Sequence, residues 1–180
     1  MIVQELAHPS LLINHEIFDS SSIKEGDHIY AWRTRSELYS HHGHSPSPRR
    51  FPGIYTATDR VVHFIGPKAK GPLKACRKCG YKRKMHGGVV ETCLDCFLSG
   101  SDVVYVYRYG MSMRDLQLSS HVLCQTCTIK KSKPASEVVE TAKEKLEVGF
   151  GEYNLVSNNC EDFATFCKTG TSFCQQAYRR

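Results

Sequence analysis

The amino-acid sequence predicts an α+β domain in which a small antiparallel sheet packs against helices. Short segments with alternating apolar residues, separated by turn residues, occupy the first part of the chain, and two segments with helical spacing follow near its end. A chain of 180 residues with 41% hydrophobic content suits one ordinary hydrophobic core. We therefore expect one domain over residues 23–170, preceded by a lead-in at 1–22 and followed by a tail at 171–180.

Four segments carry the residue types of β-strands. The turn at Gly26-Asp27 opens the first segment, a turn at Thr58-Asp59 joins the second to the third, and Gly110 closes the fourth. The fourth is the densest in β-branched and aromatic residues, which favour the pleated surface of a sheet. The four expected strands are residues 28–33, 53–57, 60–65 and 102–109.

The longer predicted helix spans residues 135–148. Pro134 stands near its start and Gly149 follows its end, as is usual at helix boundaries. Four apolar residues form a stripe at helical spacing, so this helix must pack on the sheet. The segment before it, residues 111–133, is expected to be mostly loop, with a short helical stretch around 113–118. The apolar stripe consists of Val138, Val139, Ala142 and Leu146.

A second helix is predicted to begin beside Cys160. Asn158 is expected to be its N-cap and Glu161, three residues on, to close a capping box, while Gly170 ends the helix. A cysteine in the first turn of a helix lies among unpaired backbone N–H groups and at the positive end of the helix dipole, which favours the thiolate. Cys160 is therefore a candidate nucleophile, although free cysteines are more often small buried core residues.

A nucleophilic cysteine needs a base, and His63 is the first candidate. It stands between Val62 and Phe64 inside the third expected strand. A lone strand histidine is more often a half-buried polar side chain than a catalytic group. A histidine on a strand that faces a cysteine at the start of a helix is nevertheless the base and nucleophile pair of cysteine acyl transfer.

Six stretches of the chain share the motifs of a known enzyme family. They are residues 26–33 (Gly-Asp-His-Ile-Tyr-Ala-Trp-Arg), 54–55, 61–64 (Val-Val-His-Phe), 92–100, 149–154 and 158–163 (Asn-Asn-Cys-Glu-Asp-Phe). Over residues 23–170 the chain thus resembles the LRAT-like domain, named for lecithin:retinol acyltransferase, and its plant members in particular. The resemblance implies a fold similar to circularly permuted papain-like thiol enzymes, with a cysteine-rich insertion. It also implies acyl transfer from phospholipids, or their hydrolysis, through a cysteine thioester.

The resemblance implies catalytic roles for individual residues. Cys160 matches the nucleophile, and His63 matches the second of two family histidines that lie twelve positions apart. The first histidine belongs to a His-x-x-Ile-Tyr motif, but the residue three positions before Ile54 is Phe51. A matching His-His-Gly sequence begins further upstream, at His41.

Residues 44–53 separate His41 from the second expected strand and decide how the site is interpreted. A regular strand cannot continue through their three prolines, so we expect an insertion loop over 44–53. If the loop leaves His41 near Cys160, His41 acts as general base and His63 orients it. If it does not, the chain is an inactive module that binds lipid or a protein partner. Retained intron sequence would also account for such a segment.

Nine cysteines include three Cys-x-x-Cys pairs, at residues 76/79, 93/96 and 124/127. Thirteen residues separate the first pair from the second, which approaches the spacing of tetrahedral zinc sites. We expect a cysteine-rich loop over residues 74–96 with structural Zn²⁺ as its cofactor. The third pair or His86 can replace a ligand, and unligated thiols or a redox pair are the alternative. The expected ligands are Cys76, Cys79, Cys93 and Cys96.

The net charge of +6 is concentrated between Arg60 and Lys84, where nine basic residues and no acidic one occur. Such a segment attracts anionic surfaces, so peripheral contact with an anionic membrane is one expectation and a solvated loop around the zinc site is another. A zinc-knuckle nucleic-acid binder is a further alternative. Nucleic acid is the weaker expectation as a partner, because aromatic side chains for base stacking are sparse in this segment.

The chain shows neither a secretory signal nor a membrane span. Its first residues lack the basic and apolar regions of a signal peptide, and no run approaches the roughly 18 apolar residues that cross a bilayer. We therefore expect reduced cysteines, a cytoplasmic location and no transmembrane anchor. No organic cofactor is expected.

Overall fold

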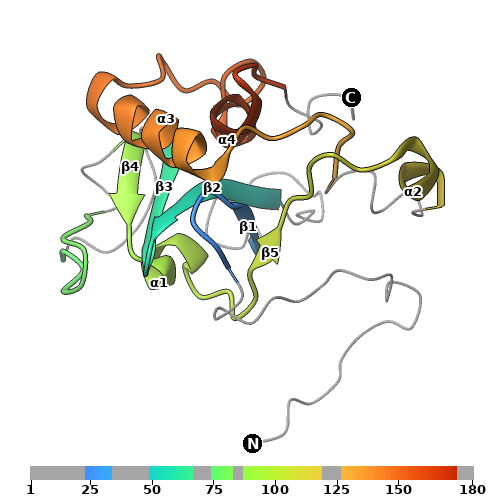
Figure 1. Cartoon of the computed structure of the whole chain (residues 1–180). Coiled ribbons are helices and arrows are strands. Elements are labelled where there is room, and N and C mark those ends of the chain that lie inside the picture. The colour runs from blue at the N-terminus through green and yellow to red at the C-terminus, as the bar shows by residue number, and fades with distance from the viewer. Residues whose placement is uncertain (1–22, 34–48, 67–73, 83–86, 119–126, 174–180) are drawn as a thin grey trace, which may run out of the picture.

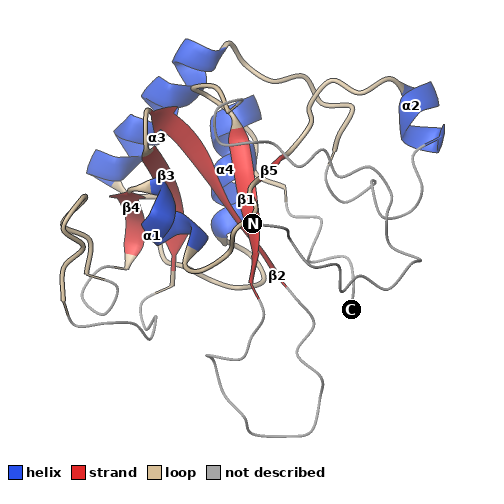
Figure 2. Cartoon of the chain, turned by 90° about the horizontal axis from the view of Figure 1, so that it is seen from below, coloured by secondary structure: helices blue, strands red, loops and turns tan. Residues whose placement is uncertain are grey.

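The computed structural model describes residues 23–33, 49–66, 74–82, 87–118 and 127–173. Within these residues five strands form one antiparallel sheet in the order β4-β3-β2-β1-β5, accompanied by four helices (Figures 1 and 2). The predicted α+β class, with an antiparallel sheet packed against helices, is confirmed. The strands are β1 (His28–Arg33), β2 (Arg49–Ala57), β3 (Arg60–Ile65), β4 (Gly88–Thr92) and β5 (Tyr105–Val106). The helices are α1 (Leu94–Leu98), α2 (Met113–Leu118), α3 (Ala135–Val148) and α4 (Cys160–Thr169).

The helices α3 and α4 cover one face of the sheet, and the short helix α1 lies against the other (Figure 1). Because successive side chains of a strand point to opposite faces, β3 contributes to both layers. Val62 and Phe64 pack with Phe163 of α4, whereas Val61 packs with Phe97 of α1. We call the face covered by α3 and α4 the α4 side and the opposite face the α1 side. The side chain of each candidate residue in a strand points to one of these two sides.

Helix boundaries follow the predicted caps closely. The helix α3 spans residues 135–148 and α2 spans 113–118, as predicted. Glycines end both α3 and α4 at the predicted positions. The strands predicted at 28–33 and 60–65 are confirmed as β1 and β3. In the part of the chain that the structure describes, no helix combines the length and the apolar character needed to cross a membrane.

Two predicted segments differ from the structure. The strand expected over 102–109 is wrong in length, because β5 contains Tyr105 and Val106 alone. After β5 the backbone N–H of Tyr107 still donates to the carbonyl oxygen of His28 at 2.8 Å, and the ring of Tyr107 stacks on the ring of His28 at a centroid distance of 4.8 Å. The loop expected over 74–96 is also wrong in part, because β4 and the first residues of α1 lie within it. Its cysteine-rich composition concealed a strand whose Val89 and Val90 pair with β3.

The expected insertion loop over 44–53 is wrong for its second half. Residues 49–53 form the first part of β2 and pair with β1 in continuous register, including Pro52. Proline is tolerated here because the pairing of β2 with β3 begins only at Ile54, so the ladder runs along one side of this part of the strand. Residues 44–48 lie outside the described residues. The segment that interrupts the family motif is therefore partly built into the sheet.

We expect Gly26→Ala to destabilise the fold strongly. Gly26 has a φ of +84°, and a Cβ there would lie 2.8 Å from Cα of Ala135, the first residue of α3. A left-handed conformation costs about 1–2 kcal/mol and overpacking a further 1–3 kcal/mol or so, which lowers the free energy of unfolding by roughly 2–5 kcal/mol. Urea denaturation measures the loss. Gly110→Ala is the matched control, because Gly110 has a φ of +71° and no atom within 4 Å of such a Cβ. Equal losses in the two variants would contradict the packing argument.

Candidate functional site

Cys160 is the first residue of α4, at the helix start that the sequence predicts for the nucleophile. The N-cap is Asn159, so the predicted cap and capping box are each wrong by one residue. The side-chain oxygen of Asn159 accepts the backbone N–H of Glu161 at 2.8 Å and that of Asp162 at 3.4 Å. The carboxylate of Asp162 accepts the N–H of Asn159 at 3.0 Å and closes the box. The helix α4 therefore begins at a fixed point, and Cys160 carries its first side chain.

Asn158, the predicted N-cap, instead holds the loop that leads into α4. Its side-chain amide donates to the carbonyl oxygens of Phe150 and Glu152 at 2.8 and 2.9 Å. Its backbone N–H and carbonyl both bond to the backbone of Asn154, at 3.0 and 2.8 Å. These bonds fix the chain immediately before Cys160, which favours a defined position of the thiol.

The two cysteines of α4 have different surroundings. Cys167 is fully buried in the core with Phe163, and burial raises the pKa of its thiol to about 12. Such a thiol is inert at neutral pH, because the thiolate is the nucleophilic form. Cys160 keeps an exposed fraction of 9% at the start of the helix. Of these two thiols, Cys160 is the one that combines a helix start with access from outside the core.

His63 lies in β3 on the α1 side of the sheet. Its Nε2 is 3.2 Å from Oγ1 of Thr92, and Phe97 of α1 meets its ring edge-on at a centroid distance of 5.3 Å. Gly53 makes room for this packing, because a Cβ at Gly53 would lie only 3.1 Å from Cβ of His63. His41 lies outside the described residues. The structure thus places His63 on the face of the sheet opposite to the one that α4 covers, and the grouping of both histidines with Cys160 stays a prediction.

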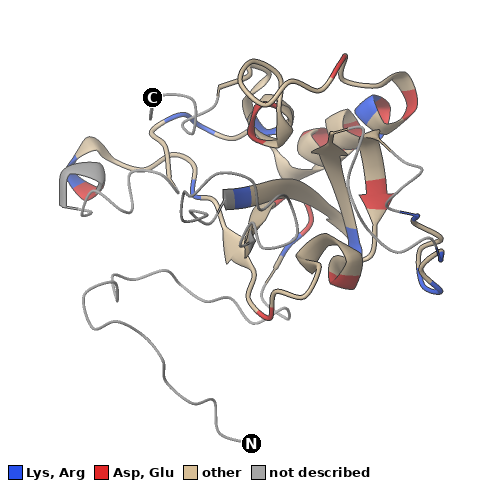
Figure 3. Cartoon of the chain, turned by 180° about the vertical axis from the view of Figure 1, so that it is seen from behind, with Lys and Arg blue, Asp and Glu red and all other residues tan. Residues whose placement is uncertain are grey.

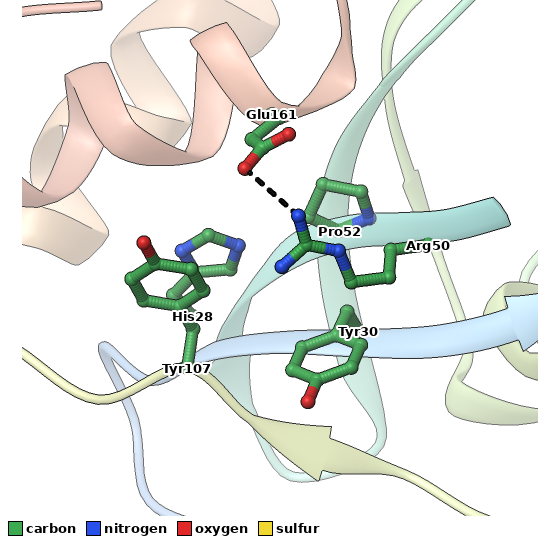
Figure 4. Close-up of a pocket in the computed structure, with 6 residues that line it drawn as sticks. All are labelled: His28, Tyr30, Arg50, Pro52, Tyr107 and Glu161. Atoms are coloured by element: carbon green, nitrogen blue, oxygen red, sulfur yellow. Dashed lines mark hydrogen bonds and ion pairs between the residues drawn. The ribbon is translucent and has the colours of Figure 1, made fainter. Parts of the chain in front are cut away.

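A small pocket lies on the α4 side of the sheet, against the first turn of α4 (Figure 4). Arg50 and Glu161 form an ion pair within it, with Nη2 3.4 Å from Oε1, and their side chains are 5% and 2% exposed. Sequence reasoning missed this pair, because Arg50 falls in the expected loop and Glu161 in the expected capping box. The residues that line the pocket are His28, Tyr30, Arg50, Pro52, Tyr107 and Glu161.

His28 is the described histidine on the α4 side. Its side chain is buried, its ring stacks on Tyr107, and its Nδ1 lies 2.9 Å from the hydroxyl oxygen of Tyr109. Burial, together with the positive charges of Lys168 and Arg50, holds the pKa of His28 well below its usual range. The imidazole is therefore neutral at pH 7. A neutral ring in this position can donate one hydrogen bond and accept another.

The four predicted zinc ligands lie together. The sulfur atoms of Cys76, Cys79, Cys93 and Cys96 are all within 4.8 Å of one another. The Cys76–Cys93 and Cys79–Cys96 sulfur distances are 3.8 and 3.7 Å. Four thiolates around Zn²⁺, at about 2.3 Å each, form a tetrahedron with edges of about 3.8 Å, whereas a disulfide joins two sulfurs at about 2.05 Å. The arrangement therefore fits a tetrahedral metal ion.

Backbone N–H groups favour a thiolate in this four-cysteine cluster. Hydrogen bonds from the N–H of Cys79 and then of Lys78 lower the pKa of Cys76 to about 6. A thiol with this pKa is ionised at neutral pH, and the thiolate is the form that binds a metal ion. Burial acts in the opposite direction on Cys93 and raises its pKa. A metal ion would supply the positive charge that the four neighbouring sulfurs need to ionise together.

The cluster is attached to the sheet through α1. Cys93 is the N-cap residue of α1, and the next N–H, from Leu94, donates to the carboxylate of Asp59 at 3.0 Å. Asp59 belongs to the turn between β2 and β3, and an ion pair between Lys78 and Asp95 joins the first cysteine pair to α1. A metal ion here would thus hold α1 in place against the sheet.

The alternative ligands considered from the sequence do not join the cluster as far as the structure describes them. Cys124 and His86 lie outside the described residues. Cys127 is buried elsewhere, where its backbone forms an isolated bridge with Arg108. Among the described residues, the candidate ligand set therefore remains Cys76, Cys79, Cys93 and Cys96.

Comparison with known proteins finds one family model and several relatives that this chain resembles. Residues 21–173 match the family model described as "Lecithin retinol acyltransferase". The chain is 38% identical over 172 residues to "Protein LEAD-SENSITIVE 1" of Arabidopsis thaliana, a match that covers 84% of this chain and 59% of that protein. It is 25% identical over 166 residues to "Lecithin retinol acyltransferase" of Homo sapiens, covering 91% of this chain and 62% of that protein. The matches thus span about three fifths of the length of these relatives.

Proposed function

The chain belongs to the lecithin retinol acyltransferase family, and we propose that it is a thiol enzyme that forms an acyl thioester on Cys160 from a lipid ester. The observation that carries this proposal is the position of Cys160 as the first residue of a capped helix, braced from the preceding loop. The dipole of α4 favours a thiolate at that position. The family match includes this helix, which supports the same reaction class for this chain.

The proposed reaction proceeds in two balanced steps. The Cys160 thiolate attacks the ester carbonyl carbon, the bond to the alcohol oxygen breaks, and the departing oxygen receives the proton that a base removed from the thiol. Water or an amine then attacks the thioester carbonyl carbon and loses a proton to the base, the carbon–sulfur bond breaks, and the sulfur leaves as thiolate. Water as acceptor gives hydrolysis, and an amine gives acyl transfer.

We propose His41 as general base and His63 as its orienting partner, as the family resemblance implies. The continuity of β2 through residues 49–53 supports an intact sheet beneath the site rather than a strand broken by the insertion. An inactive module that binds lipid or a protein partner is the competing proposal. It predicts normal folding and no covalent intermediate on Cys160.

We also propose that the four-cysteine cluster holds structural Zn²⁺, supported by sulfur distances close to a tetrahedral edge. When bound, the ion would tie together two segments of the chain rather than take part in acyl transfer. The loop that contains the first cysteine pair, residues 74–82, is basic. Figure 3 shows lysine and arginine along this loop. We propose that these charges support peripheral contact with an anionic membrane, from a reducing, cytoplasmic compartment.

The intact mass of the protein after incubation with phosphatidylcholine vesicles tests the proposed function. We expect a gain of one acyl group in the wild-type protein and in Cys167→Ala, and no gain in Cys160→Ala. Cys167→Ala is the matched control because it removes a thiol of the same helix that burial makes inert. An acyl group that persists in Cys160→Ala would refute the assignment of the nucleophile. Absence of the adduct from the wild-type protein, across choline, ethanolamine and neutral lipid esters, would favour the inactive module.

A further inference from the structure

Exposed apolar side chains gather where the chain passes from α3 to α4. Among the described residues, five large apolar side chains are exposed, and three of them lie in or beside this connection. Val148, the last residue of α3, is 69% exposed, and Leu155 and Val156 are 48% and 49% exposed. Figure 1 shows the connection crossing the top of the molecule between the two helices. Such a concentration of apolar side chains on a surface indicates a contact with something outside the domain.

Leu155 and Val156 lie within a tight turn that two asparagines close. The backbone N–H of Asn154 donates to the carbonyl oxygen of Asn158 at 2.8 Å, and the reverse bond measures 3.0 Å. The side-chain oxygen of Asn154 also accepts the N–H of Val156 at 2.9 Å. We call residues 154–158 the apolar turn. Its shape is held by backbone and asparagine groups, so the apolar side chains are not needed to hold it.

The chain itself satisfies most backbone groups of the apolar turn. The carbonyl oxygen of Leu155 accepts the side-chain amide of Asn159 at 3.2 Å, and the N–H of Ser157 donates to the side chain of Asn154 at 3.1 Å. A protein partner can supply hydrogen bonds to a loop, whereas the hydrocarbon of a bilayer cannot, so backbone that enters lipid must be satisfied internally. A turn with internal hydrogen bonds and exposed apolar side chains therefore suits a lipid surface.

The apolar turn is joined directly to the start of α4. Asn159, whose amide meets the carbonyl oxygen of Leu155, is the N-cap of that helix, and Cys160 follows it. The side chain of Asn158 ties the same turn to the carbonyl oxygens of the preceding loop. The turn and the start of α4 are thus one hydrogen-bonded unit. Whatever surface the turn contacts is brought close to Cys160.

The basic loop of residues 74–82 lies at the other end of β3. It meets Cys93, the residue after β4, where β4 pairs with Val61 near the start of β3. Tyr153, which precedes the apolar turn, lies beyond the end of β3, because a Cβ on Gly66 would come within 3.2 Å of its ring. The six residues of β3 span roughly 20 Å. Contact through the basic loop alone would therefore leave the apolar turn away from the lipid.

We propose that the apolar turn enters the surface of a phosphatidylcholine bilayer, with the side chains of Leu155 and Val156 at the boundary between headgroups and acyl chains. This inference rests on the proposed reaction with a lipid ester. No residue of the turn is charged, so its entry needs no anionic lipid and is driven by the burial of apolar surface. Entry would bring Cys160 to the level at which the ester groups of the lipid lie.

Binding to vesicles tests this contact on Cys160→Ala protein, which lacks the proposed nucleophile. Sedimentation with sucrose-loaded phosphatidylcholine vesicles gives the partition coefficient with and without Leu155→Ser and Val156→Ser together. We expect this double variant to bind about tenfold more weakly or worse, at low and at high salt alike, because salt does not screen apolar burial. Met113→Ser with Ile129→Ser is the matched control, because these side chains are 58% and 50% exposed and lie outside the turn.

Tryptophan fluorescence locates the side chain that enters the lipid. Val156→Trp and the control Ile129→Trp each add a second tryptophan to the chain, beside Trp32. Emission is measured with phosphatidylcholine that carries bromine on its acyl chains. We expect the bromine to quench the added emission of Val156→Trp and to leave that of Ile129→Trp unchanged. Equal quenching of both variants, or quenching of neither, would overturn the proposal.

The outcomes of the vesicle experiment separate the possible contacts. Salt-resistant binding that the double variant weakens and the matched control does not would support the proposal. Binding that requires phosphatidylserine, disappears at high salt and is equal in the double variant would overturn it in favour of the basic loop. A dimer in the absence of lipid that the double variant loses, measured by analytical ultracentrifugation, would overturn it in favour of a second copy of the chain. Circular dichroism of each variant ensures a folded reference.

Kinetics on protein with Cys160 intact separate this proposal from the proposed function. The ratio of kcat/KM for phosphatidylcholine in vesicles to that for a monomeric short-chain phosphatidylcholine should fall about tenfold in the double variant. An equal fall with both substrates would overturn the proposal, because it would show that the turn contacts the substrate molecule itself. If no acyl adduct forms but vesicle binding changes as expected, the proposed function fails while the bilayer contact stands. If acylation proceeds with an unchanged ratio, the bilayer contact fails while the proposed function stands.

Discussion

Removal of the proposed zinc ion from the four-cysteine cluster should unfold the segment from Cys76 to α1 while leaving α3 and α4 in place. Structural zinc contributes about 10–16 kcal/mol of apparent binding free energy in small peptides, and such segments fold only with the ion. Here the helix that the cluster supports has five residues, far too few to persist alone. Phe97 of that helix packs against His63, so the loss of α1 would also expose the histidine.

Hydrogen exchange before and after treatment with a strong chelator measures this effect. We expect the amides of residues 88–98 to lose protection, and Cys96→Ser to reproduce the loss without chelator. Cys127→Ser is the matched control, since Cys127 is a buried thiol outside the cluster. Native mass spectrometry should find one zinc ion in the wild-type protein and in the control. Unchanged protection of α1 after complete removal of the metal would show that the packing against β3 suffices without it.

The sequence predicts those features that depend on local chemistry. The limits of α3 follow from Pro134 at its start and Gly149 at its end, because these residue types favour helix boundaries through their own backbone preferences. Cysteine spacing likewise predicts which four sulfur atoms lie together, because two Cys-x-x-Cys pairs suit one tetrahedral ion. The position of Cys160 at a helix start follows from the asparagines before it, although either could have served as the cap. Local composition predicts the wrong structure for residues 88–92, because the two flanking cysteine pairs indicate a metal-binding loop whereas these residues form β4.

The features that sequence reasoning missed depend on tertiary structure. A strand tolerates a proline where one of its two edges has no hydrogen-bonded neighbour. Whether that holds at Pro52 depends on the pairing of the sheet, which the sequence around Pro52 does not reveal. The partner of Glu161 is 111 residues away in sequence. An alternating pattern could have placed Arg50 on the same face as Pro52 once both were assigned to a strand. In the family motif a histidine stands three residues before Ile54, where this chain has Phe51.

Arg50→Met should lower the free energy of unfolding by about 3–5 kcal/mol, because it removes the guanidinium that faces a buried carboxylate. Glu161 is 2% exposed, so water cannot replace the guanidinium. The paired change Arg50→Met with Glu161→Gln should recover most of this loss, since a buried ion pair replaced as a unit costs little. Urea denaturation of the single and paired variants measures the difference. Arg60→Met, at an ion pair whose side chains are 35% and 40% exposed, should change stability by less than about 1 kcal/mol.

The insertion supplies Arg50, the partner of Glu161 in the buried ion pair. Deleting residues 44–53 would restore the family motif in sequence, but it would also put Ser40 in the place of Arg50 and take the guanidinium away from Glu161. The insertion is then a source of a buried contact beside the nucleophile rather than only an interruption. If Arg50→Met proved no more destabilising than Arg60→Met, Glu161 would not depend on Arg50, and the insertion could be removed without structural cost. A large loss that the paired variant repairs would mean that the chain has come to depend on the segment that breaks its motif.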